Sequence, residues 1–207
     1  MELYCIGYAG RDKDKTLEHI EELKEIGVPE PKSIPEMYHI NSNLLTREKK
    51  MKVVGDKTSA EVEIVLIFDE NGSTSVTVGS DHTDRSLEAV SIHKSKQICE
   101  KPIASKKWHL NEVIDEWDDL RLYAKVKQNG KWVRYQEGTV SAIIPLSEIK
   151  RFLNNHDVET KNAIVYCGTV PLVNGFIYGD AYKCGIESKK QGDIIEVEYE
   201  VERVKEQ

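Results

Sequence analysis

The chain has 207 residues, a formal net charge of −7, 39% hydrophobic residues and 31% charged residues, a profile typical of a globular protein with one sizeable core. No apolar run approaches the length of a membrane span, and the first five residues lack the pattern of a secretory signal, so we expect a cytoplasmic protein without a membrane partner. The acidic balance argues against a nucleic-acid partner, and a local group of lysines within residues 94–107 favours a small anionic ligand.

The N-terminal part of the chain is predicted to contain a short strand, one helix, a candidate second short strand and connecting segments. Residues 2–8 form the first strand, residues 37–45 are the candidate second strand, and residues 13–26 form a helix with an aspartate as N-cap and a glycine after its end. His19 and Glu22 are three positions apart on this helix, close enough for the carboxylate to orient and polarise the imidazole. The pair also has an ordinary explanation, because the helix is so rich in glutamate that any histidine on it would have an acidic neighbour. Residues 46–57 are charged and are predicted to be a connection.

A hairpin carrying two glutamates follows this segment. Residues 61–68 are a β-branched run that becomes continuously apolar, and residues 69–72 have the composition of a turn. Because successive strand residues face opposite sides, Glu61 and Glu63 point to one face and their carboxylates can converge. The spacing alone is weak evidence, since residues 196–202 repeat it in the pattern of an edge strand with a solvated acidic face. The apolar run that directly follows Glu61 and Glu63 places them near the mouth of a core.

Three polar stretches after the hairpin are candidates for ligand binding. Residues 78–85 combine two aspartates, a histidine, a threonine and an arginine, and Gly79 lets the backbone approach a ligand closely; the alternative is a solvated turn. Lys94 can lie over a substrate anion or shuttle a proton, or else belong to a solvated basic loop. The turn at residues 167–171 offers backbone N–H groups and the Thr169 hydroxyl to an anionic oxygen.

Strands dominate the rest of the chain, and no alternation of strands with helices appears. The further predicted elements are a hairpin over 123–136, a helix over 146–153, a strand over 163–166 and a strand over 193–204. We therefore predict a mainly β protein with short helices (α+β), folded as a mixed β-roll or sandwich. We expect a single domain over 1–207, in which the helix and connecting segment of 1–57 pack on a β-roll formed by 58–207.

Seven motifs, taken in chain order over about residues 5–205, resemble those of the fumarylacetoacetate hydrolase superfamily, in a DUF-type branch of it. The motifs are H-x-x-E at His19 to Glu22, E-x-E at Glu61 to Glu63, D-x-T-x-R at Asp81 to Arg85, a lysine loop at Lys94 to Pro102, an N-G … Q-E-G-T hairpin at Asn129 to Thr139 that is similar to the family's N-G … Q-E-G-x-T, a glycine-threonine-proline loop at Cys167 to Pro171 and G-D-x-V-x-V-E at Gly192 to Glu198. The chain departs from the family pattern at Lys96, where an aromatic residue is common, and at Glu88, where a substrate-binding glutamine is expected. These departures favour a more polar substrate.

The resemblance implies a fumarylacetoacetate-hydrolase-like mixed β-roll that is usually a homodimer and holds a divalent cation on Glu61, Glu63 and Asp81. Three hard oxygen ligands suit Mg²⁺, with Mn²⁺ or Ca²⁺ as alternatives. The remaining implied roles are water activation by His19 and Glu22, an active-site lysine at Lys94, and substrate binding by Arg85, Thr169 and Gln136.

The function implied by the resemblance is that of a Mg²⁺-dependent hydrolase, which cleaves a C–C bond of an acylpyruvate- or fumarylacetoacetate-like diketo acid through a metal-stabilised enolate. One alternative is a decarboxylase, hydratase or isomerase of a small 2-oxo acid on the same metal site. Others are a non-catalytic relative that binds a metal or a carboxylate, and a structural β-domain without a ligand.

Overall fold

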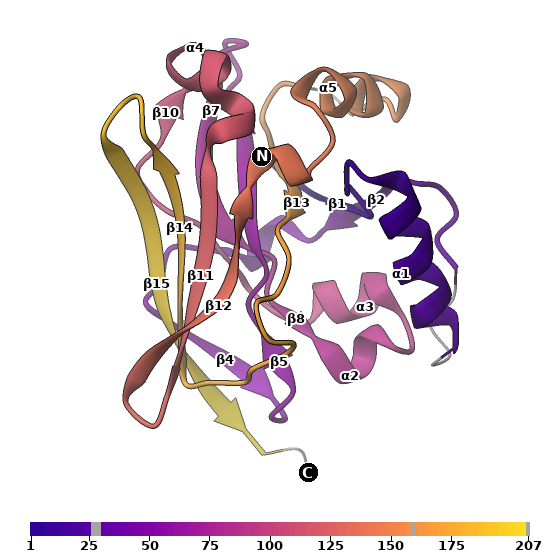
Figure 1. Cartoon of the computed structure of the whole chain (residues 1–207), viewed down its shortest axis with the longest axis vertical. Helices are drawn as coiled ribbons and strands as arrows, with labels where there is room; N and C mark the ends of the chain where they lie inside the picture. The colour runs from indigo at the N-terminus through magenta and orange to yellow at the C-terminus, as the bar shows by residue number, and fades with distance from the viewer. Residues whose placement is uncertain (26–29, 159, 206–207) are drawn as a thin grey trace.

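Two β-sheets form the framework of the structure (Figure 1). The computed structural model describes residues 1–25, 30–158 and 160–205, and it describes their side chains except those of His19, Glu22, Leu23 and Glu25. The six-stranded sheet has the order β10 (Trp108–His109), β7 (Thr74–Ser80), β6 (Val62–Phe68), β13 (Ala163–Thr169), β1 (Glu2–Gly7) and β2 (Glu36–Ile40). The five-stranded sheet has the order β12 (Lys131–Thr139), β11 (Arg121–Gln128), β14 (Ala181–Ser188), β15 (Asp193–Val204) and β4 (Lys50–Val54).

The remaining elements are short. Two small ladders pair β3 (Leu45–Thr46) with β9 (Lys101–Pro102), and β5 (Thr58–Ser59) with β8 (Thr83–Asp84). The α-helices are α1 (Lys13–Glu25), α2 (Arg85–Glu88), α3 (Ile92–Gln97), α4 (Leu110–Val113) and α5 (Leu146–Asn155), and the 3₁₀ helices are η1 (Ser42–Leu44), η2 (Ile114–Asp119) and η3 (Val140–Ala142). The predicted mainly β fold with short helices is confirmed. In the described part of the chain, no helix combines the length and the apolar character needed to cross a membrane.

The two faces of the six-stranded sheet pack against different parts of the molecule, because side chains alternate along each strand. Ile64 and Leu66 of β6 belong to the large core cluster that also contains residues of the five-stranded sheet. Val65 and Ile67 belong to a second, smaller cluster on the opposite face, against which Ile92 of α3 packs. Helices α1, α2 and α3 lie together on the side of the molecule away from the five-stranded sheet (Figure 1). Every second side chain of β6, counted from Val65, therefore points toward these helices.

The first 57 residues contribute more to the sheets than the sequence predicted. Strand β1 pairs in parallel with β13 and antiparallel with β2, inside the six-stranded sheet. Residues 46–57, predicted to be a connection, contain β4, which pairs in parallel with β15. Met51 and Val53 are buried while Lys50 and Lys52 are exposed. This is the alternation of a half-buried strand, but the exposed lysines made the segment look like a charged connection in the sequence. The single domain over 1–207 stays a prediction.

Candidate active site and metal centre

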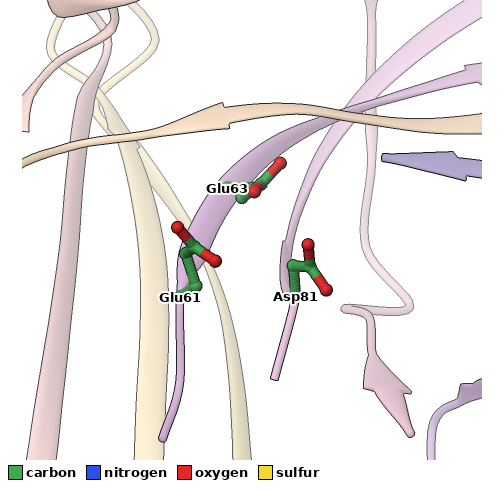
Figure 2. A group of neighbouring side chains, drawn as sticks. All are labelled: Glu61, Glu63 and Asp81. Atoms are coloured by element: carbon green, nitrogen blue, oxygen red, sulfur yellow. The ribbon is translucent and has the colours of Figure 1, made fainter. Parts of the chain in front are cut away.

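Three acidic side chains meet on the outer face of the six-stranded sheet. Glu61 immediately precedes β6, Glu63 lies within it, and Asp81 immediately follows the neighbouring strand β7. Strand pairing sets Glu63 beside Gly79, and the Asp81 amide donates to the Glu61 carbonyl at 2.9 Å. One carboxylate oxygen of each acid lies within 4.8 Å of those of the other two, and the three side chains converge from adjacent strands (Figure 2). The predicted convergence of Glu61, Glu63 and Asp81 is thus present.

Asp81 is fully buried between two lysines. The ammonium of Lys96 lies 2.5 Å from Asp81 Oδ2, and that of Lys101 lies 2.9 Å from Asp81 Oδ1. Burial alone would raise the pKa of Asp81, but Lys101 and Lys96 together hold it below its ordinary value. Although Lys101 is close, its well-oriented hydrogen bond goes to the His82 carbonyl at 2.7 Å. Asp81 Oδ1 accepts no hydrogen bond of good geometry from the described residues.

Glu63 is held by an irregularity in the neighbouring strand. The register between β13 and β6 shifts between Tyr166 and Thr169, and Gly168 within that shift has φ +121°. This conformation favours glycine, and it turns the Gly168 amide toward Glu63 Oε2 at 2.8 Å. Burial raises the pKa of the Glu63 carboxyl, and repulsion by Asp81 and Glu61 raises it further.

The donor set fits a divalent metal ion. Three carboxylates are the hard oxygen ligands that magnesium and calcium prefer. Two of them, Glu63 and Asp81, are buried, so the cluster differs from an acidic patch on the surface. Asp81 Oδ1 still has capacity to accept, and the mutual repulsion that raises the pKa of Glu63 would be relieved by a cation between the acids. The triad can therefore hold a divalent ion.

Arg85 supports this site from the start of α2. Its Nε donates to Ser59 Oγ at 2.9 Å, and its Nη1 contacts the two carboxylate oxygens of Glu88 at 3.0 and 3.1 Å. Its Nη2 lies 3.7 Å from Glu61 Oε2. The ring of Phe176 covers the guanidinium, 4.9 Å from it. Arg85 was predicted to bind a substrate carboxylate, and in the structure its donors already have partners in the protein.

Gln136 and Thr169, also predicted to bind substrate, join strands to one another. Gln136 Oε1 accepts from the Val62 amide at 2.9 Å, and its Nε2 donates to Thr169 Oγ1 and to the Val170 carbonyl, both at 2.8 Å. The Thr169 hydroxyl donates to the Val62 carbonyl at 2.7 Å. Both side chains thus hydrogen-bond to the backbone of Val62, which lies between Glu61 and Glu63, and so help to position the two acids.

The predicted active-site lysine is placed elsewhere. Lys94 is exposed on α3, whereas Lys96 is buried and its ammonium contacts Asp81 and lies 3.5 Å from Glu61 Oε2. Two positions along a helix rotate a side chain by about 200°, so only one of the two lysines can face the sheet. The Ser91 side chain caps the helix and helps to set which one does. Lys96, and not the predicted Lys94, is therefore the α3 lysine that contacts the acidic triad.

The remaining predicted site residues are His19, Glu22 and Gly79. His19 and Glu22 lie in α1, but their side chains fall outside the described residues. Gly79 was predicted to let the backbone approach a ligand; it lies inside β7, and a Cβ atom there would meet the Tyr166 ring at 2.6 Å and the Pro102 carbonyl at 2.8 Å, so it serves packing. Lys101 was not predicted as a site residue, since a buried lysine in a two-residue strand has no periodic pattern.

One further residue near the site was missed. Tyr8 follows β1 with φ +54°, a left-handed conformation that is uncommon for a bulky residue. Burial raises the pKa of its hydroxyl to about 12, and the charges of Glu36 and Glu88 act in the same direction while Lys96 opposes them.

Comparison with solved structures defines the fold. The structure described as 2-keto-3-deoxy-D-arabinonate dehydratase complexed with magnesium and 2,5-dioxopentanoate matches with a TM-score of 0.70 and 15% identity, covering 99% of this chain and 74% of that one. The 4-oxalocrotonate decarboxylase from Pseudomonas putida G7, complexed with calcium and acetate, matches with a TM-score of 0.62 and 12% identity, covering 96% and 76%. The fold class is accordingly the predicted fumarylacetoacetate-hydrolase-like one.

No curated protein matches the sequence at a significant level. A family model does match it, over residues 6–199, which include the acidic triad, both buried lysines and nearly all strands of the two sheets. The chain therefore belongs to the family described as protein of unknown function DUF2848.

Proposed function

We propose that the protein is a divalent-metal-dependent enzyme that acts on a small 2-oxo acid. The observation that carries this proposal is the convergence of Glu61, Glu63 and Asp81 beside two buried lysines. The names of the similar structures support it, since they are enzymes of small oxo acids with magnesium or calcium present. Magnesium is the ion that we propose, with manganese or calcium as alternatives.

Each residue has a chemical role in this proposal. Glu61, Glu63 and Asp81 would hold the ion, which supplies Lewis-acid polarisation of a keto group when bound. Lys96 carries a proton at Nζ next to two of these acids; burial lowers its pKa, but Asp81 and Glu61 raise it well above the ordinary value. It can therefore stabilise negative charge that develops on the substrate. Arg85 holds Glu61 in position.

The specific reaction that we propose is hydrolysis of a C–C bond in an acylpyruvate-like diketo acid. Hydrolysis needs a base to activate water, and we assign this role to His19 oriented by Glu22, on the strength of their motif and spacing. Decarboxylation or dehydration of a small 2-oxo acid is the second candidate. The position of Lys96 favours it, because such reactions require charge stabilisation and proton transfer but no attacking water.

Metal binding tests the site directly. In Glu61→Gln, Glu63→Gln and Asp81→Asn, calorimetric Mg²⁺ affinity should fall by at least about 100-fold, because each change removes an anionic ligand. Glu198→Gln and Glu200→Gln are matched controls: they have the same E-x-E spacing on β15, but their side chains are exposed and their Mg²⁺ affinity should be unchanged. Unchanged affinity in all three site variants would exclude the proposed metal centre.

Product analysis separates the candidate reactions. Acetylpyruvate, oxaloacetate and a 2-keto-3-deoxy sugar acid are incubated with the enzyme in Mg²⁺ and, in parallel, in EDTA. Metal-dependent release of acetate and pyruvate from acetylpyruvate identifies the hydrolase, whereas carbon dioxide from oxaloacetate or dehydration of the sugar acid identifies the second candidate. We also propose a homodimer in the cytoplasm, and light scattering after size-exclusion chromatography tests the dimer.

A further inference from the structure

The guanidinium of Arg85 is occupied by a carboxylate of the chain itself. An arginine fork is the group best suited to hold a substrate carboxylate through two hydrogen bonds. Here both oxygens of Glu88 lie against Arg85 Nη1, at 3.0 and 3.1 Å. The side chains retain only 8% and 23% of their exposure, and Phe176 covers the guanidinium plane. Glu88 thus occupies Nη1 of Arg85, a donor that could otherwise bind a carboxylate.

The two lysines at the site are also paired. Lys96 contacts Asp81 and lies 3.5 Å from Glu61, and Lys101 contacts Asp81. Among the described side chains, the cations that pair with the triad are these two lysines and Arg85, and each already faces a carboxylate. A second substrate carboxylate would have to compete with Glu88 for Arg85.

The charge balance of the site with a divalent ion bound also disfavours a second substrate carboxylate. Three protein cations and a divalent ion carry five positive charges, against four carboxylates: Glu61, Glu63, Asp81 and Glu88. The excess of one positive charge is neutralised by one carboxylate of a 2-oxo acid. A second carboxylate would leave an uncompensated negative charge in a largely buried site, which is unfavourable.

We infer that Glu88 is a specificity-determining residue that makes the site select 2-oxo acids with a single carboxylate and a neutral polar tail over 2-oxo dicarboxylates. This inference rests on the proposed function of the site and deepens it by naming the substrate class. It requires no change in the metal ligands, since Glu88 acts through the charge available at Arg85.

The test compares two ligands of equal chain length, 5-hydroxy-2-oxopentanoate and 2-oxoglutarate, by calorimetry in the presence of Mg²⁺. The wild-type protein should bind the hydroxy acid more tightly. In Glu88→Gln the ratio of the two dissociation constants should move toward 2-oxoglutarate by about 10- to 100-fold, because the freed Arg85 gains a charge-assisted hydrogen bond to the second carboxylate. Glu88→Asp keeps the negative charge and should keep the wild-type ratio.

The control is Glu137→Gln on β12. Glu137 accepts from Arg121 Nη2 at 2.6 Å, so the variant also disrupts an arginine–glutamate pair, but it does so away from the triad and should leave the ratio unchanged. If Glu88→Gln is poorly folded, Glu88→Ala tests the same release of Arg85, with Mg²⁺ affinity as the check on the site.

The possible outcomes distinguish a failure of the inference about Glu88 from a failure of the proposed function. If the wild-type protein binds both ligands and the ratio does not move in either charge-removing variant, the inference fails while the proposed function stands. A wild-type preference for 2-oxoglutarate would likewise overturn the inference alone. Absence of Mg²⁺-dependent binding of either ligand to folded wild-type protein would overturn the proposed function and the inference with it.

Discussion

Lys101 shows how a single residue can be central to the site without any local signal. Its ammonium is fully buried, lies 2.9 Å from Asp81 and donates to the His82 carbonyl. A buried lysine is costly unless it is paired, and removing one member of a buried pair leaves the other charge poorly compensated. Lys101 and Asp81 therefore stabilise the fold at the same point at which they shape the site.

Lys101→Met should lower the free energy of unfolding by about 3 kcal/mol, because it leaves Asp81 with one of its two cations and the His82 carbonyl without its donor. Urea unfolding measures the change. Lys106→Met is the matched control, since its partner Asp193 is near the surface, and its effect should stay below about 1 kcal/mol. Equal losses in the two variants would contradict this account of Lys101.

At the scale of elements, the site depends on how β6 is held at its first residues. Hydrogen bonds from β12 and β13 converge there, through the Gln136 amide and the Thr169 hydroxyl. Both residues were predicted to contact substrate, and their side chains contact the backbone of Val62. Both residues therefore help to position Glu61 and Glu63, and their contact with substrate stays a prediction.

Gln136→Leu should destabilise the protein by roughly 2–4 kcal/mol, because the buried Val62 amide and the Val170 carbonyl each lose a partner. Mg²⁺ affinity should weaken at the same time, since the strand that carries two ligands is less well fixed. Unfolding curves and calorimetry measure the two effects. Gln128→Leu is the control, because its amide bonds the Tyr178 carbonyl at an exposed position and should change neither quantity.

On the scale of the whole molecule, the proposed metal ion would join β6 to β7, two neighbouring strands of the six-stranded sheet. An ion that binds only the folded state stabilises it by mass action. The metal centre therefore has a consequence for global stability that requires no substrate.

Mg²⁺ at 100 times its dissociation constant should stabilise the protein by about 2.7 kcal/mol and raise Tm by roughly 5–10 °C, an effect that EDTA reverses. Thermal unfolding with and without Mg²⁺ measures the shift. Asp81→Asn should lose it, and Glu198→Gln, changed on the exposed face of β15, should keep it. A shift of the same size in Asp81→Asn would locate the binding elsewhere on the protein.

Much of the site could be predicted from local patterns. The period of two puts Glu61 and Glu63 on one face, and the hairpin fixes the register of β6 against β7, so Asp81 arrives beside them after a short interval. These relations hold within about 20 residues and need only strand geometry and one turn. The helix α1, the final strand β15 and the mainly β class follow from similar local signals.

Only the tertiary structure decided which side chains surround the acids. Whether Lys94 or Lys96 faces the sheet depends on the phase of a six-residue helix, and the role of Gln136 depends on contacts with Val62, 74 positions away. The strand β4 and the buried Lys101 likewise need distant partners to become ordered. The strand period by itself determined that Glu61 and Glu63 face the same side, and the family resemblance added Asp81; long-range packing decided the counter-ions of all three, because charge pairing and burial across sheets leave no periodic trace in the chain.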